Sequence, residues 1–160
     1  MSTIKRCALI TGASAGIGAT FARFLAAEGY DLLLVARREE RLRDLAVELT
    51  AAYNIRCEIF AADLTDSAAP CAIIAYAKQQ HLTIDFLVNN AGLSGSKQFV
   101  ETPWSELAGE IQLMITAVTE LARLVAPDMK ARGWGRIINL SSIAAFAPPA
   151  ASLLYTGIKS

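Results

Sequence analysis

The chain has 160 residues, which is enough for one domain with a hydrophobic core and too few for two domains of ordinary size. Fifteen basic and fifteen acidic side chains balance, so no overall charge attracts the chain to nucleic acid or anionic lipid. Hydrophobic residues make up 54% and charged residues 19%, which excludes a disordered protein, and every apolar run is far shorter than the ~20 residues of a membrane-spanning helix.

Short β-rich runs alternate with longer helical patterns along the whole chain. The predicted strands are Lys5–Thr11, Asp31–Ala36, Arg56–Ala61, Ile84–Asn89 and Gly135–Ser141. The predicted helices are Gly16–Glu28, Arg38–Ala52, Ser67–His81 and Pro103–Ala131. The strands are apolar almost throughout, as expected for parallel strands that are covered on both faces, and the helices repeat apolar residues at helical intervals. This alternation predicts right-handed βαβ units in an α/β fold, with a doubly wound parallel sheet as the middle of three layers.

The three cysteines point neither to disulfides nor to a metal site. Their number is odd, none is in a Cys-x-x-Cys spacing, and Cys7 and Cys57 lie inside predicted strands. We therefore expect buried free thiols, a cytoplasmic location and no bound metal. The single histidine, His81, follows a predicted helix near a turn and is interpreted as a surface residue.

A glycine-rich turn joins the first predicted strand to the first predicted helix. It reads Thr-Gly-Ala-Ser-Ala-Gly-Ile-Gly over residues 11–18. Its first glycine permits a tight turn, the second lets the backbone approach a diphosphate, and the third lets the helix lie close to the sheet. The free N–H groups of the helix N-terminus favour anionic phosphates, although glycines that merely mark a turn are the alternative. The predicted cofactor-binding residues here are Gly12, Ser14, Gly16, Ile17 and Gly18.

The charges at the end of the second predicted strand favour NADP(H) over NAD(H). An NAD-binding domain usually offers an acidic side chain to the ribose 2′-hydroxyl at this place, whereas here Arg37 and Arg38 follow the strand and the first carboxylate is Glu39. Arginine binds a 2′-phosphate through charge-assisted, often bidentate hydrogen bonds. We expect Arg37 to be the leading contact and Arg38 the second. The alternative is that both arginines begin a solvated helix whose charges pair with one another.

Four motifs, in order along the chain, resemble those of the short-chain dehydrogenase/reductase family. They are the Gly-x-x-x-Gly-x-Gly turn, Asn-Asn-Ala-Gly at 89–92, Gly-Arg-Ile-Ile-Asn-Leu-Ser-Ser at 135–142 and Tyr-x-x-x-Lys at 155–159. The last motif alone is weak, but four motifs in order are specific. The resemblance implies a single NAD(P)-binding Rossmann domain over residues 1–160. It also implies cofactor contacts from Asp63 and Leu64 at the adenine and from Asn89, Ala91 and Gly92 along the adenosine ribose, while Asp63 could otherwise serve only in a turn or a helix cap.

The same resemblance implies that Ser142, Tyr155 and Lys159 are catalytic, and that Tyr155 and Lys159 also contact the cofactor. Tyr155 and Lys159 are four residues apart, so on a helix they face the same way. A free tyrosine has a pKa of ~10, and a nearby ammonium stabilises the tyrosinate. Tyr155 would exchange a proton with the substrate oxygen, Ser142 would hydrogen-bond that oxygen, and Lys159 would hold the nicotinamide ribose. Without the other motifs, Ser142 would be interpreted as a strand end and Tyr155 as a surface aromatic residue.

The chain departs from the family at two places. Relatives often carry an asparagine in the long fourth helix, where it kinks the helix and supports a water-linked proton relay to the lysine. Met114 stands at that place, and a thioether cannot donate a hydrogen bond. The sequence also ends at Ser160, at the start of the catalytic helix, so the resemblance implies a C-terminally truncated form whose fold is incomplete on that side.

The function that the resemblance implies is that of an NADP(H)-dependent oxidoreductase, which interconverts a carbonyl and an alcohol by hydride transfer. The expected partner is a small-molecule carbonyl or alcohol substrate, without nucleic acid or membrane, and the full-length form is expected to be a homo-oligomer. The alternative is a non-catalytic dinucleotide-binding module or a degenerate paralogue, which Met114 favours.

Overall fold

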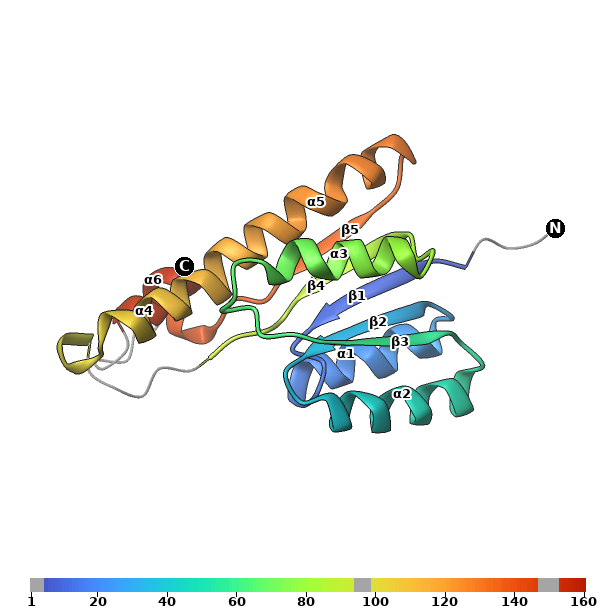
Figure 1. Ribbon diagram of the computed structural model, residues 1–160, viewed down its shortest axis with the longest axis horizontal. Coiled ribbons are helices and arrows are strands. Elements are labelled where there is room, and N and C mark those ends of the chain that lie inside the picture. Colours follow the sequence, from blue (N-terminus) through green and yellow to red (C-terminus); the bar gives the residue numbers. More distant parts are fainter. Residues whose placement is uncertain (1–4, 94–98, 147–152) are drawn as a thin grey trace.

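The computed structural model describes residues 5–93, 99–146 and 153–160, which form a parallel sheet between two layers of helices (Figure 1). The five strands are β1 (Cys7–Thr11), β2 (Asp31–Ala36), β3 (Cys57–Ala61), β4 (Ile84–Asn89) and β5 (Arg136–Asn139). The α-helices are α1 (Gly16–Ala27), α2 (Glu39–Tyr53), α3 (Ala69–Gln79), α4 (Trp104–Ile111), α5 (Ala117–Ala131) and α6 (Leu153–Lys159). Two short 3₁₀ helices, η1 (Phe99–Glu101) and η3 (Ile143–Ala145), and a π-helical segment, η2 (Gln112–Thr116), complete the elements. The predicted three-layer doubly wound fold is confirmed.

The strand order, β3-β2-β1-β4-β5, reverses direction between β1 and β4. Strands β1, β2 and β3 follow one another toward one edge of the sheet. The chain then crosses back, and β4 and β5 lie on the other side of β1. The register sets Ile10 of β1 beside Leu34 of β2 and Val88 of β4. In doubly wound sheets the ligand crevice lies outside the carboxyl ends of the strands at this reversal. A ligand crevice is therefore expected beside the segments that follow β1, β2 and β4.

The sheet is buried on both faces, which is why its strands are apolar almost throughout. Alternate residues of β1 face opposite sides, so Leu9 joins a cluster with α3 and α5, and Ile10 joins a second cluster with α1 and α2. Ile73 and Leu121 are fully buried in the first cluster, and Leu42 is fully buried in the second. Each such side chain contributes roughly 1.5–3 kcal/mol when it leaves water. The two clusters fix the strand ends that carry the site.

The long helix predicted over residues 103–131 is interrupted. It begins one residue later than predicted, with α4, and the π-helical segment η2 separates α4 from α5. The backbone N–H of Ala117 donates to the carbonyl oxygen of Gln112, five residues earlier instead of four. A π turn inserts one residue into the helical repeat and so rotates the helix that follows. Leu113 and Met114, inside this turn, are both buried against the sheet.

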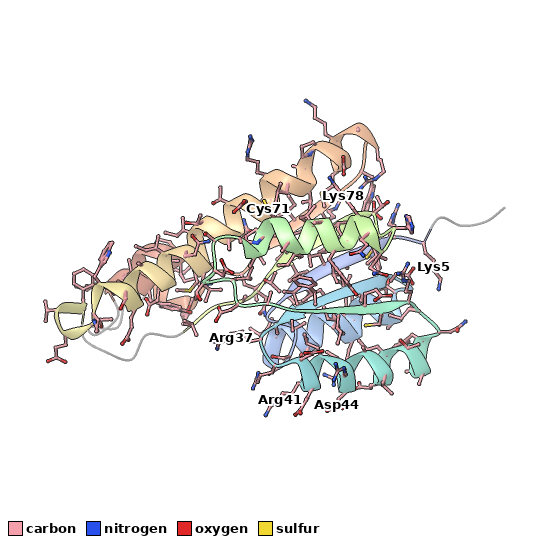
Figure 2. All side chains as sticks on the ribbon, in the orientation of Figure 1. Lys5, Arg37, Arg41, Asp44, Cys71 and Lys78 are labelled. Atoms are coloured by element: carbon pink, nitrogen blue, oxygen red, sulfur yellow. The ribbon has the colours of Figure 1, made fainter. Side chains whose placement is uncertain are left out.

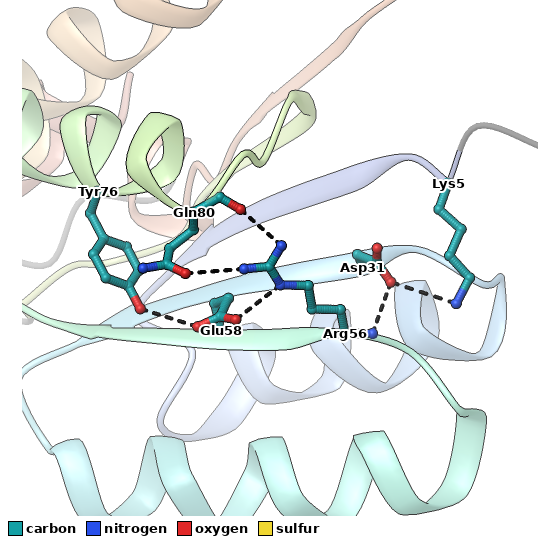
Figure 3. A network of polar contacts seen from close by, with 6 residues as sticks. All are labelled: Lys5, Asp31, Arg56, Glu58, Tyr76 and Gln80. Atoms are coloured by element: carbon teal, nitrogen blue, oxygen red, sulfur yellow. Dashed lines mark hydrogen bonds and ion pairs between the residues drawn. The ribbon is translucent and has the colours of Figure 1, made fainter.

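A polar network ties the edge strand β3 to its neighbours (Figure 3). Arg56 donates from its side chain to Glu58 on β3 and to the backbone and side-chain oxygens of Gln80, which follows α3. The backbone N–H of Arg56 donates to Asp31 of β2 over 2.8 Å, and the hydroxyl of Tyr76 donates to Glu58. These bonds lie at the amino ends of the strands. They therefore stabilise the end of the sheet that is opposite to the reversal crevice.

The three cysteines are free thiols, with Cys7 buried, Cys57 half-buried and Cys71 exposed. His81 is exposed, as predicted. Within residues 5–93, 99–146 and 153–160, no three His, Cys, Asp or Glu side chains are arranged to hold a metal ion. No helix of these same residues has the length and hydrophobicity that crossing a membrane requires.

Candidate functional site

A pocket of about 330 Å³ lies at the carboxyl ends of β1, β2 and β4. Eight of the predicted cofactor-binding residues line it: Gly12, Ser14, Arg37, Arg38, Asp63, Leu64, Ala91 and Gly92. Seven further residues complete its wall: Ala15, Val35, Ala36, Ala62, Asn90, Leu93 and Leu113. The structure therefore brings together residues from five separate segments of the chain at one end of the sheet.

The glycine turn supplies one wall of this pocket, and two of its glycines are required by close contact. A Cβ added to Gly12 would lie 2.6 Å from Nδ2 of Asn90, and a Cβ added to Gly18 would lie 2.4 Å from the carbonyl oxygen of Gly12. Gly12 and Gly16 also have positive φ angles of 66° and 54°, which favour glycine. Gly16, Ile17 and Gly18 begin α1 and are not among the wall residues, and the side chain of Ile17 is exposed.

The N-terminus of α1 faces this turn without a side-chain cap. The residue before the helix is Ala15, whose methyl group cannot accept a hydrogen bond. The first N–H groups of a helix have no intrahelical acceptor, so they are available to an anion. Uncapped N–H groups of this kind suit an anion such as a pyrophosphate.

A threonine and an asparagine hold the turn in place. The hydroxyl of Thr11 accepts the backbone N–H groups of Asn90 and Ala91, each over 3.0 Å, and donates to the carbonyl oxygen of Val88. Nδ2 of Asn90 donates to the carbonyl oxygens of Thr11 and Gly12 over 2.9 and 3.2 Å. The loop after β4 is thus bonded to the turn after β1. Asn90 was not among the predicted cofactor-binding residues, although its position in the Asn-Asn-Ala-Gly motif was a signal for it.

The two arginines after β2 have different surroundings. Nε and Nη2 of Arg38 donate to the hydroxyl of Ser14 over 3.3 and 3.0 Å, which places this guanidinium against the glycine turn. Arg37 instead lies with Nη1 3.8 Å from a carboxylate oxygen of Asp63, and Figure 2 shows it at the end of the sheet away from Lys5. Glu39 pairs with Arg43 further along α2. The arrangement offers two cations to an anion at the end of β2.

Asp63 has a structural role in the turn after β3. One of its carboxylate oxygens accepts the backbone N–H of Thr65 over 3.0 Å and the Thr65 hydroxyl over 2.9 Å. The backbone N–H of Thr65, then the Thr65 hydroxyl and the charge of Arg37 lower the pKa of Asp63 below its ordinary value. Asp63 is therefore a turn residue, as the alternative held, and it also lines the pocket beside the buried Leu64.

The three predicted catalytic residues come from β5's end and from α6. Nζ of Lys159 lies 6.0 Å from the centre of the Tyr155 ring and donates to the carbonyl oxygen of Leu140 over 2.8 Å. The hydroxyl of Ser142 accepts the N–H of Ala144 and so caps η3. A Cβ added to Gly92 would lie 3.8 Å from Nζ of Lys159, so α6 brings the lysine against the loop after β4. None of the three catalytic candidates lines the 330 Å³ pocket itself.

Asn89 lies outside the pocket as well. Its Nδ2 donates to the side-chain oxygen of Asn139 on β5 over 2.9 Å and to the carbonyl oxygen of Val118 on α5 over 3.4 Å. It lines a second cavity together with Lys159. Asn89 is thus apart from Gly92, which lines the 330 Å³ pocket, whereas Ala91 lines both cavities.

Comparisons with known proteins agree with this geometry. A family model for short chain dehydrogenases matches residues 6–160. The chain is 34% identical to a very-long-chain 3-oxoacyl-CoA reductase-A from Danio rerio, over 98% of this chain and 50% of that protein. It is 35% identical to a probable NADP-dependent dehydrogenase from Haemophilus influenzae, over 95% of this chain and 59% of that protein. The chain therefore spans about half the length of the curated relatives it matches.

Solved structures share the fold over nearly the whole chain. A short-chain dehydrogenase from Sphingobium yanoikuyae in complex with NADPH superposes with a TM-score of 0.89 at 40% identity, covering 96% of this chain and 60% of that one. An L-sorbose reductase from Gluconobacter frateurii, complexed with NADPH and L-sorbose, gives a TM-score of 0.91 at 33% identity, covering 97% and 59%. The match of residues 6–160, the strand order and the glycine turn together show that this chain belongs to the short-chain dehydrogenase family.

Proposed function

We propose that the chain binds NADP(H) in the 330 Å³ pocket and contributes to an oxidoreductase that interconverts a carbonyl and an alcohol. The observation that carries this proposal is the guanidinium of Arg38, held on the hydroxyl of Ser14 beside the glycine turn. A cation fixed at the end of β2 suits a 2′-phosphate, which NADP(H) has and NAD(H) lacks. The relatives from Sphingobium yanoikuyae and Gluconobacter frateurii are both complexes with NADPH, which supports the same choice.

Each part of the pocket suits one part of the cofactor. The N-terminus of α1 would hold the pyrophosphate, and Arg38, with Arg37 beside it, would hold the 2′-phosphate. Asp63 and Leu64 would border the adenine, and Ala91 and Gly92 would border the adenosine ribose.

The chemistry that we propose divides between the cofactor and three side chains. Bound NADPH supplies a hydride for the carbonyl carbon. The Tyr155 hydroxyl donates a proton to the carbonyl oxygen, which completes the alcohol, and the Ser142 hydroxyl hydrogen-bonds that oxygen. Lys159 supplies a positive charge near the Tyr155 ring, which stabilises the tyrosinate left after proton transfer.

Nucleotide affinities test the cofactor assignment. We expect NADPH to bind more tightly than NADH, and Arg38→Ala to weaken NADPH binding about 10- to 100-fold, since a hydrogen bond to a charged group is worth roughly 1.5–3 kcal/mol. NADH binding is expected to stay unchanged, because it lacks the phosphate. Arg37→Ala is expected to cost less, because Asp63 already faces that cation. Fluorescence titration of both cofactors measures these constants.

Arg43→Ala is the matched control, because Arg43 lies on α2 and pairs with Glu39 away from the pocket. If Arg38→Ala weakened NADH and NADPH equally, the 2′-phosphate would not be its partner. If the natural chain bound both cofactors equally, the choice of NADP(H) would be wrong.

A second candidate function is a dinucleotide-binding module without chemistry. Met114 favours it, because this buried thioether stands near Lys159, where the family resemblance implies a polar side chain of the proton relay. NADPH oxidation over a panel of carbonyl compounds separates the two: binding without turnover supports the module.

We further propose that the whole protein is a homo-oligomer and works in the cytoplasm. The free thiols of Cys7 and Cys57 support a reducing compartment. Family membership supports the oligomer, and sedimentation velocity of the whole protein tests it.

A further inference from the structure

Asp63 is the one carboxylate among the described residues that line the 330 Å³ pocket, and it faces a cation on the same wall. Its oxygen Oδ2 lies 3.8 Å from Nη1 of Arg37. Both side chains are about half exposed, so water and dissolved salt weaken the attraction between them. A pair of this kind is readily exchanged for a stronger one.

The two oxygens of the Asp63 carboxylate have separate tasks. Oδ1 accepts the backbone N–H of Thr65 over 3.0 Å and the Thr65 hydroxyl over 2.9 Å, which holds the carboxylate in the turn after β3. Oδ2 is the atom that faces Arg37. In the described part of the chain no hydrogen bond holds the guanidinium of Arg37, whereas that of Arg38 is bonded to Ser14. Asp63 is therefore the fixed partner of the pair, and Arg37 is the one free to move.

A phosphate at the end of β2 would compete with Asp63 for this cation. Near neutral pH a phosphate monoester carries more negative charge than a carboxylate, and it has three strong acceptor oxygens. Arginine binds such a group through charge-assisted, often bidentate hydrogen bonds. Once Arg37 turned to the phosphate, Oδ2 of Asp63 would be a carboxylate oxygen without its cation beside a second anion. Like charges repel, so part of the gain from Arg37 would be lost.

We propose that Asp63 sets the cofactor preference of the chain by competing with the 2′-phosphate of NADP(H) for Arg37. NAD(H) lacks this phosphate and leaves the Arg37–Asp63 pair intact. Asp63 thereby holds the affinity for NADP(H) below the level that two free arginines would give, and it is a specificity-determining residue as well as a turn residue. The inference rests on the proposed function, because it places the 2′-phosphate at the end of β2.

Asp63→Asn tests this competition, because asparagine keeps an oxygen for Thr65 and removes the charge. The quantity to measure is the ratio of the NADH to the NADPH dissociation constant, in which contacts to the shared parts of the cofactors cancel. We expect the ratio to rise about two- to fivefold, as is typical of one pair of exposed charges. In the Arg37→Ala background the same substitution should change the ratio less than about 1.5-fold, since no Arg37 remains to be released.

Equal gains in the two backgrounds would mean that Asp63 repels the phosphate directly, and the competition would be refuted. Asp66→Asn is the matched control, because it makes the same change of charge three residues further along. Asp66 accepts the N–H of Ala68 and does not line the pocket. The ratio should stay at its natural value in this variant. A rise as large as that in Asp63→Asn would assign the effect to net charge and overturn the inference.

The chain without cofactor gives an independent measurement. The N–H of Thr65, then its hydroxyl and the charge of Arg37 lower the pKa of Asp63. Carbon magnetic resonance of the labelled carboxyl should show a higher pKa in Arg37→Ala, which replaces an exposed side chain. An unchanged pKa would show that the pair does not form in solution and would overturn the inference.

Failure of the proposed function and failure of this inference are distinguishable. If NADPH did not bind, the proposed function would be wrong, while the pKa of Asp63 would still respond to Arg37→Ala. If the natural chain preferred NADPH and Asp63→Asn left the ratio unchanged, this inference alone would be wrong.

Discussion

The three thiols of the chain have three different surroundings, and each surrounding raises the thiol pKa. Burial, followed by the negative charges of Asp31 and Asp85, raises the pKa of Cys7 far above its ordinary value. Burial raises the pKa of Cys57 to about 12. Cys71 is exposed, and the hydrogen bond from its thiol to the carboxylate of Glu120 raises its pKa. A higher pKa means less thiolate at a given pH and therefore a slower reaction with electrophiles.

We expect a disulfide reagent to modify Cys71 first, and more slowly than a free cysteine at pH 8. Glu120→Gln should speed this reaction about two- to tenfold, because one pKa unit changes the thiolate population about tenfold. The gain should disappear at a pH above the thiol pKa of both proteins, where both are thiolates. Absorbance of the released thiol measures the rates, and Asp128→Asn on the same helix is the control. An unchanged rate in Glu120→Gln would show that the Cys71–Glu120 hydrogen bond does not form.

Tyr155 is expected to be the proton donor, so Tyr155→Phe should abolish carbonyl reduction while leaving the folded domain intact. Residual turnover at least ~10²-fold below the natural level is expected, since positioned proton transfer typically contributes 10²–10⁴-fold. NADPH consumption measures turnover in the whole protein, and NADPH titration of the same variant shows that the pocket is preserved. Natural turnover in Tyr155→Phe would remove this residue from the mechanism.

At the level of single residues, the short motifs predicted which residues line the pocket better than they predicted the contacts of each side chain. Gly12, Ser14 and Asp63 line the pocket because their motifs act through local backbone geometry. The contacts of Arg37 and Arg38 could not be predicted, because side-chain directions after a strand depend on distant partners such as Ser14 and Asp63. Asn89 and Asn90 are neighbours in the chain, but Asn89 is bonded to β5 and Asn90 to β1. The motif alone did not indicate this difference.

Among the elements, the turn from β1 into α1 depends most on residue size. A Cβ at position 18 would contact backbone atoms of Gly12, which cannot move as a flexible side chain does. We expect Gly18→Ala to lower the free energy of unfolding by about 1–3 kcal/mol, as overpacking does. Denaturant unfolding followed by circular dichroism measures the change.

Gly157→Ala is the matched control for that substitution. Gly157 lies within α6, and an added Cβ would meet nothing within 4 Å. Alanine inside a helix is favoured over glycine by roughly 0.5–1 kcal/mol, so this variant should be as stable as the natural chain or slightly more stable. Equal losses in the two variants would contradict the assigned close approach.

The apolar patterns predicted the strands well and the long helix only in part. The bounds of β2 and β4 are those predicted. The first and third strands begin later than predicted, since Lys5, Arg6 and Arg56 lie outside them, and the fifth strand is shorter than predicted at both ends. The π turn at residues 112–116 could not be located from hydrophobic spacing, because one inserted residue shifts a broad apolar face only slightly.

For the molecule as a whole, the strand order predicts a gradient of local stability. β1 has a paired strand on each side, whereas β5, among the described residues, is paired only with β4 and much of its surface is exposed. Hydrogen exchange of backbone amides should therefore be slowest in β1, at the rate of global unfolding, and on average at least ~10-fold faster in β5. Mass spectrometry of peptides after deuterium labelling measures this order. Equal protection of the two strands would show that the edge is covered in solution.

The bonds between Thr11 and Asn90 join residues 79 positions apart. During synthesis on the ribosome, the glycine turn emerges long before Asn90. The nascent chain at that stage therefore lacks the hydrogen bonds by which Asn90 holds the turn. These hydrogen bonds form only after β4 has paired with β1. A chain that stops before Asn90 therefore lacks the hydrogen bonds that hold the glycine turn against the loop after β4.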